Sequence, residues 1–131
     1  MDKASKTMKT SYNARVLAIL TAVVLSTASV FAAEFEVRGI KYFTSSDTEV
    51  YVAGSIINGN IVIPETVSYD GKTYTVVGVG ENAFYNRNDI YSVSFPKSVK
   101  QFSYRAFYRN QALCELRFSE GLEVIGNDAF G

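Results

Sequence analysis

Carboxylates are the residues best able to do acid–base chemistry in this chain, because its 131 residues include no histidine. General acid–base catalysis usually uses histidine or a pair of carboxylates with different pKa values. Two close pairs occur, Glu34 with Glu36 and Asp47 with Glu49. The first pair falls in a strand pattern and the second in a turn, where both are expected to be solvated. We therefore predict no catalytic residues and no enzymatic activity.

The remaining reactive motifs are equally incomplete. Cys114 is the single cysteine, so it has neither an internal disulfide partner nor a zinc-ligand spacing, and no histidine could activate it. Gly78-Val79-Gly80 precedes Glu81 without the later glycine and lysine of a phosphate-binding loop. The acidic residues are too scattered for a calcium loop. We expect no metal and no cofactor.

Charge is distributed unevenly along the chain, although 13 Lys and Arg balance 13 Asp and Glu. Lys3, Lys6, Lys9 and Arg15 make the N-terminus basic, and the rest of the chain has an acidic excess. Since no basic patch stands out elsewhere, we expect no nucleic-acid partner.

The basic N-terminus is also the first part of a sequence pattern typical of exported proteins. An uncharged, mostly apolar run follows from Val16 to Phe31, and Val30-Phe31-Ala32 places small residues before a cleavage point. We interpret residues 1–33 as a signal peptide, with the mature chain starting near Ala33. The alternative is an uncleaved anchor, but polar residues interrupt a run that is short for a membrane span. We expect a secreted or cell-surface protein with no membrane span after cleavage.

A repeat organises the C-terminal part of the chain. The pair Ala-Phe occurs at Ala83-Phe84, Ala106-Phe107 and Ala129-Phe130, at intervals of 23 residues. Five further apolar positions keep the same phase, which makes seven with the pair: Val79, Phe102 and Ile125; Ile90 and Leu113; Val93 and Leu116; Phe95 and Phe118; Val99 and Leu122. A period of 20–29 residues with this apolar core is the signature of a leucine-rich-repeat solenoid.

Each repeat predicts a strand with two different faces. Val93 and Phe95 alternate with Ser92 and Ser94, and Leu116 and Phe118 alternate with Glu115 and Arg117. Because strand side chains have a period of two, the apolar set faces inward and the polar set outward. We expect these strands to stack in parallel, with each Ala-Phe pair on a short helical or 3₁₀ segment.

Residues 34–77 lie outside this phase and predict three or four short strands joined by tight turns at Asn58-Gly59-Asn60 and Asp70-Gly71. A solenoid needs a different unit over its exposed first repeat, so we interpret 34–77 as a β-rich cap and 78–131 as repeats, two complete and one incomplete. The expected fold is mostly β with short helical turns.

The last repeat leaves apolar residues near an uncovered edge, namely Leu122, Val124, Ile125 and Phe130. We expect either a longer array, of which this chain is a piece, or self-association through that uncapped C-terminal end.

The candidate partner-binding face is the polar side of the strands together with nearby tyrosines: Ser92, Ser94, Glu115, Arg117, Tyr91, Tyr85 and Tyr108. Tyrosine is enriched at interfaces because its ring is large and amphipathic. The alternative is that the rings only shield the edges of the core.

The repeats resemble the BspA-type leucine-rich repeats, whose pattern is close to I-x-x-x-A-F, a loop, and L-x-x-I-x-I-P-x-x-V. Val79 to Phe84 and Ile90 to Val99 match it, and the next unit departs only where Ser119 replaces the proline. The preceding β-rich segment also resembles this family, and Arg87 and Asn110 stand where many members carry cysteine.

This resemblance implies a secreted or surface protein of Bacteroides-like bacteria, and some members are adhesins that bind host matrix or other cell-surface proteins. We therefore expect an adhesin-like, non-enzymatic binding module. A structural spacer or stalk within a longer repeat protein is the main alternative, and a glycan-active enzyme is the third.

Overall fold

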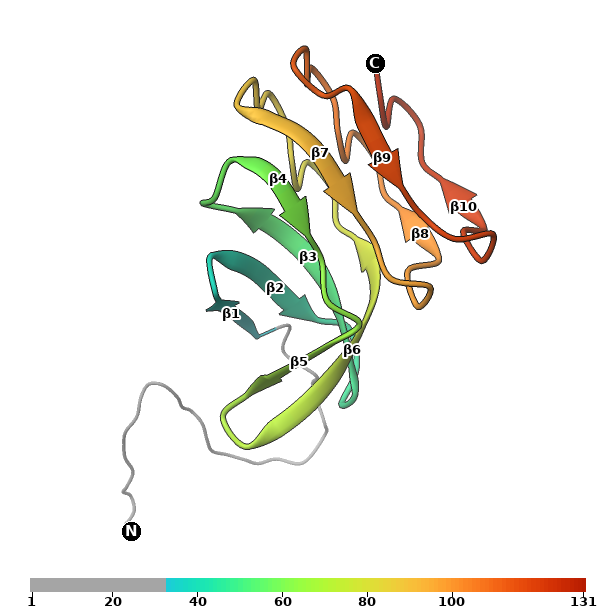
Figure 1. Cartoon of the computed structure of the whole chain (residues 1–131). Coiled ribbons are helices and arrows are strands. Elements are labelled where there is room, and N and C mark those ends of the chain that lie inside the picture. The colour runs from blue at the N-terminus through green and yellow to red at the C-terminus, as the bar shows by residue number, and fades with distance from the viewer. Residues whose placement is uncertain (1–32) are drawn as a thin grey trace, which may run out of the picture. The chain divides into compact units, whose positions relative to one another are not determined.

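The computed structural model describes residues 33–131, so all but the last residue of the expected signal peptide lies outside the described part. The described chain forms strands joined by turns and loops, and none of its residues is helical (Figure 1). In chain order the strands are β1 (Glu34–Val37), β2 (Ile40–Thr44), β3 (Glu49–Ser55), β4 (Gly59–Val62), β5 (Thr66–Tyr69), β6 (Lys72–Val79), β7 (Ile90–Ser94), β8 (Gln101–Phe102), β9 (Glu115–Arg117) and β10 (Val124–Ile125).

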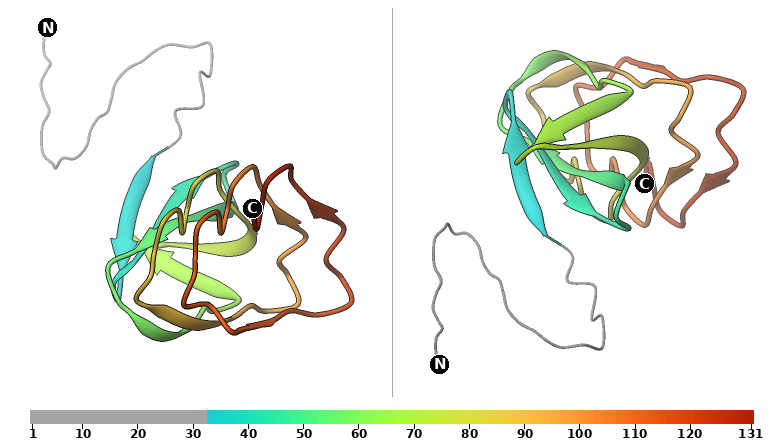
Figure 2. Two further views of the ribbon diagram at one scale, coloured as in Figure 1. Left: turned by 90° about the horizontal axis from the view of Figure 1, so that it is seen from above. Right: turned by 90° about the horizontal axis from the view of Figure 1, so that it is seen from below.

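The strands form two sheets. The large sheet has the order β1-β2-β3-β6-β8-β10, with β5 also paired to β6, and the small sheet has the order β4-β7-β9. Pairing is antiparallel among β1, β2 and β3 and between β5 and β6, and it is parallel from β3 through β10. The small sheet is parallel throughout. Successive coils after β6 lie side by side, as a solenoid requires (Figure 2).

A third side of each coil is formed by the Ala-Phe turns. The amide of Phe84 donates to the carbonyl of Ala106 at 2.8 Å, and the amide of Phe107 donates to that of Ala129 at 2.8 Å. The prediction of short helical segments here is wrong, because the structure has turns at these positions. Asn82, Arg105 and Asp128 each adopt a left-handed conformation, with φ of 55°, 53° and 55°. A right-handed helix cannot continue through such residues, so the amides pair with the next coil instead.

The interior consists of columns of equivalent apolar residues, which confirms the predicted phase. Val79 and Phe102 are fully buried at neighbouring positions of β6 and β8, and Phe84 and Phe107 stack beside them. Val93 is fully buried in β7 and pairs with Leu116 of β9, which is partly buried. Each coil thus completes the core of its neighbour, because one coil alone buries too little apolar surface.

The repeat stack begins earlier than the boundary that the sequence analysis placed between residues 77 and 78. Strand β4, assigned there to the cap, is the first strand of the small sheet, and Ile61 pairs with Val93 of β7. The hairpin of β5 and β6 lengthens this coil, so Asn60 and Ser92 are 32 residues apart, against 23 for equivalent positions in the next coil. Because of that insertion, β4 does not follow the 23-residue period, and the sequence analysis did not assign it to the repeats.

The N-terminal end of the stack is closed by β1, β2 and the β5–β6 hairpin. The Phe35 ring stacks on Tyr69 at a centroid distance of 4.4 Å and lies 5.6 Å from Tyr74. At the other end, Val124, Ile125 and Phe130 remain about half exposed. The two ends therefore differ in how far their apolar residues are covered.

Candidate functional site

The outer face of the small sheet collects four of the seven expected partner-binding residues. Ser92 pairs with Glu115, and Ser94 pairs with Arg117, in the parallel register of β7 and β9. Strand β4 adds a third residue to each pair, so that Asn60 lies next to Ser92 and Val62 lies next to Ser94. Sequence reasoning missed Asn60 and Val62, and the signal that could have found them is the match of Ile61-Val62-Ile63-Pro64 to the strand pattern of the repeats.

This face is polar and its charges are paired. The Ser92 hydroxyl donates to Oδ1 of Asn60 at 2.9 Å, and Nε of Arg117 donates to Oε2 of Glu115 at 2.5 Å. The Val62 side chain is 72% exposed beside them, so it offers an apolar contact next to the charged pair. The arrangement can form hydrogen bonds with a partner and presents one internal ion pair to it.

The tyrosines are placed differently. Tyr85 and Tyr108 lie in the Ala-Phe turns, not on strands, and their rings stack at 5.7 Å with an interplanar angle of 11°. The Arg105 guanidinium lies 4.7 Å from the Tyr108 ring and 4.9 Å from the Tyr104 ring, within range of a cation–π contact. Tyr91 is the one exposed tyrosine of the set that belongs to β7. The expected site thus divides into a strand face and a row of turn aromatics.

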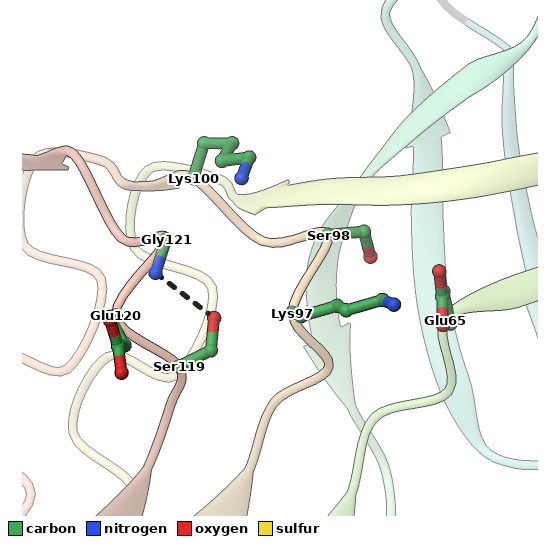
Figure 3. Close-up of a pocket in the computed structure, with 7 residues that line it drawn as sticks. All are labelled: Glu65, Lys97, Ser98, Lys100, Ser119, Glu120 and Gly121. Atoms are coloured by element: carbon green, nitrogen blue, oxygen red, sulfur yellow. Dashed lines mark hydrogen bonds between the residues drawn. The ribbon is translucent and has the colours of Figure 1, made fainter.

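A depression of about 560 Å³ lies among the loops that follow β4, β7 and β9 (Figure 3). Its lining mixes charges of both signs, with Lys97 and Lys100 from one loop and Glu65 and Glu120 from the two others. The amide of Gly121 donates to the Ser119 hydroxyl at 3.2 Å, which tightens the last of these loops. Such a mixed, loop-lined hollow shows no preference for one ligand charge.

In the described part of the chain, two titratable groups have clearly shifted pKa values, and both shifts have structural causes. Hydrogen bonds from Arg87 hold the pKa of the Asp89 carboxyl below its usual range. Burial raises the pKa of Tyr42 to about 12. These residues belong to a loop contact and to the core, respectively. Neither lies in a set of groups that could exchange a proton with a substrate.

Arg87 has a positioning role that its place in the repeat did not predict. Its guanidinium donates to both carboxylate oxygens of Asp89, at 2.8 and 3.0 Å, and to the carbonyls of Ser55 and Ile57 in the preceding coil. Asn110, one repeat later, donates in the same way to the carbonyl of Phe84. Arg87 and Asn110 thus each make a polar link between neighbouring coils.

Within residues 33–131, no group of three or more potential ligands could hold a metal ion. No helix in the same range is long and apolar enough to cross a membrane.

The fold and the repeated strand face define a leucine-rich-repeat module. The family model described as "BspA type Leucine rich repeat region (6 copies)" matches residues 59–131, more than half of the chain. The chain belongs to this family. The match begins at Gly59, the first residue of β4, in agreement with the sheet that β4 starts.

Solved structures of similar fold come from bacterial leucine-rich-repeat proteins. A leucine rich cell surface protein of Faecalibacterium prausnitzii has a TM-score of 0.68 and 22% identity over 78% of this chain and 28% of its own. A leucine-rich repeat protein of Bacteroides capillosus has a TM-score of 0.64 and 26% identity over 70% of both chains. The leucine rich repeat protein of T. pallidum has a TM-score of 0.59 and 26% identity, over 71% of this chain and 42% of its own.

The chain therefore spans only 28% of the F. prausnitzii surface protein. No curated protein is significantly similar to this chain.

Proposed function

We propose that this protein is an exported, non-enzymatic module that binds another protein through the outer face of the small sheet. The observation that carries the proposal is the pair of outward-facing, mostly polar rows across β4, β7 and β9, in which equivalent positions of successive coils form one surface. Solenoids use such extended faces for binding. The cell-surface description of the F. prausnitzii protein supports a surface location for this chain as well.

Adhesion to host matrix proteins or to other cell-surface proteins is the form of binding we propose. The test is binding of the full exported chain to immobilised fibronectin, fibrinogen and whole bacterial cells. Arg117→Glu reverses the exposed charge on the proposed face and should weaken binding at least about tenfold, since a like-charge contact opposes the complementary partner. Lys41→Glu is the matched control, because Lys41 lies on β2 of the large sheet.

Equal loss of binding in both variants would contradict the proposed face. If a chain shown to be folded binds none of the immobilised proteins or cells, the adhesin role is contradicted. Export is tested separately by N-terminal sequencing of the secreted protein, for which we expect a start near Ala33. A start at Met1 would overturn cleavage.

Self-association through the C-terminal end is the second candidate. Val124, Ile125 and Phe130 are 48%, 54% and 48% exposed at the edge of β10, where another apolar surface could cover them. Sedimentation velocity at micromolar concentration should then show dimers that Ile125→Lys abolishes. A monomer at this concentration would contradict self-association.

A further inference from the structure

A second surface lies on the outer face of the large sheet. It centres on one row of paired residues that crosses four strands. Phe43 of β2 pairs with Tyr51 of β3, Tyr51 pairs with Gly78 of β6, and Gly78 pairs with Gln101 of β8. Neighbours in such a row project from the same face of a sheet. The row therefore sets two aromatic rings and an amide side by side.

The Tyr51 ring lies flat on the sheet because Gly78 has no side chain. A Cβ built on Gly78 would lie 2.4 Å from Cε2 of Tyr51 and 2.8 and 2.9 Å from the two ring atoms bonded to it. The two flanking distances are only slightly longer than the shortest one, as happens where an atom lies above the face of a ring; an approach to its edge would make them clearly longer. One face of Tyr51 is thus pressed on the backbone, and the opposite face points away from the sheet.

The Phe43 ring lies next to Tyr51 in a nearly parallel, offset arrangement. It is inclined by only 21° to the Tyr51 ring, with centroids 5.5 Å apart. It occupies the space above Gly80, where a Cβ would lie 2.7 Å from Cε1 of Phe43. Both rings are partly exposed. Two glycines in β6 and just after it therefore make room for a two-ring platform.

Hydrogen-bonding groups border the platform. The Tyr51 hydroxyl donates to Oε1 of Gln101 at 3.4 Å, and Nε2 of Gln101 donates to the Ser103 hydroxyl at 3.3 Å. One amide hydrogen of Gln101 and the hydroxyl hydrogen of Ser103 are left for a ligand. These residues line a depression of about 550 Å³ that also includes Glu34 and Glu81.

We propose that this depression binds a neutral oligosaccharide, with sugar rings stacked on Tyr51 and Phe43. Pyranose rings present flat faces of C–H groups, which fit a flat aromatic surface, and their hydroxyls both donate and accept hydrogen bonds. A small-molecule site typically combines apolar and aromatic lining with a few polar groups, in a volume of this size. The carboxylates can accept from sugar hydroxyls.

Other ligand classes fit this surface less well. Among residues 33–131, no basic side chain lines the depression, so sulfated or sialylated glycans and phosphates would meet two carboxylates and no cation. An extended peptide could not add to the sheet here, because β3, β6 and β8 each have a strand on both sides. The two rings are nearly parallel, so they do not surround a cationic group as an aromatic cage does.

The experiment titrates the full exported chain, labelled with ¹⁵N, with cellohexaose, xylohexaose, mannohexaose and N-acetylchitohexaose, and with hexalysine as a cationic probe. We expect saturable shifts at the amides of Gly78 and Gly80 and at the side-chain amide of Gln101 for at least one sugar. The amides of Ser92 and Arg117 should not move. Tyr51→Ala and Gln101→Ala should each weaken binding about tenfold.

Tyr85→Ala is the matched control, since it removes a partly exposed tyrosine from a turn outside the large sheet. Circular dichroism establishes whether each variant is folded. If Tyr51→Ala does not fold, Gln101→Ala still tests the site. No shift with any sugar, shifts confined to the small sheet, or binding of hexalysine alone would each overturn the proposal. Because protein binding is assigned to the small sheet, either proposal can fail without the other.

Discussion

Phe84 and Phe107 stack face to face in successive coils, with centroids 5.2 Å apart and an angle of 5° between the rings. Phe130 continues the stack at 5.4 Å and 4° from Phe107. One ring from each coil thus contacts the next, in a column that runs through the interior. The column links the repeat in the sequence to the stability of the stack.

Phe107→Ala should destabilise the protein more than any surface change. The ring is 2% exposed and has neighbours on both faces, so its removal leaves a cavity. Such a change typically costs about 3–5 kcal/mol. The melting temperature should fall by more than about 10 °C. Phe130→Ala is the control, because its ring is half exposed and should cost roughly 1 kcal/mol. Equal effects would show that the column does not carry the stability.

Arg87→Ala should cost about 1–3 kcal/mol in urea unfolding, because two backbone carbonyls of the preceding coil lose their donor. Arg117→Ala removes an exposed ion pair instead and should change stability by less than about 1 kcal/mol. The side chain of Arg87 is 22% exposed and that of Arg117 is 71% exposed, which is why the two should differ. A smaller effect at Arg87 would contradict its linking role.

The contact of Arg87 with Asp89 should make stability depend on pH in the acid range. The folded pKa of Asp89 is lowered, so its stabilising contribution is present above the usual carboxyl pKa and is lost as the pH falls through the lowered value. Wild type should therefore exceed Asp89→Asn in stability at neutral pH, and the difference should vanish in strong acid. Unfolding by urea across this range measures it. In an Arg87→Ala background, Asp89→Asn should have little effect at any pH.

Gly78 and Tyr51 should be energetically coupled. Gly78→Ala places a methyl group against the Tyr51 ring and should cost about 1–3 kcal/mol. In a Tyr51→Ala background the same change should be nearly neutral, since the obstructing ring is gone. A double-mutant cycle of unfolding free energies measures the coupling. Additive effects would mean that the ring does not depend on the glycine.

The regular part of the fold could be predicted from the sequence, and the irregular part could not. The 23-residue phase predicted the alignment of Val79 with Phe102 and the inward and outward sides of β7 and β9, because equivalent residues of a solenoid occupy equivalent places. The place of β4 was missed, since the β5–β6 hairpin shifts it out of phase. The helical form of the Ala-Phe segments was wrong, because apolar spacing does not reveal the left-handed residues before each alanine.

The candidate site shows the same division. Alternation along single strands was enough to place Ser92, Ser94, Glu115 and Arg117 on one face. Their polar neighbour Asn60 and the platform of Phe43 and Tyr51 were not predicted. Phe43, Tyr51, Gly78 and Gln101 belong to four strands without a common sequence period, so only pairing across the sheet brings them together.

The sequence by itself determined that this protein stacks coils of one repeat, because a fixed interval between apolar residues forces them into shared columns. Tertiary structure alone decided where the stack begins, which carbonyls Arg87 reaches, and which side chains meet on the large sheet. Those outcomes depend on the lateral register of strands far apart in the chain, and a strand's own residues specify which way they face but not which neighbour they will meet.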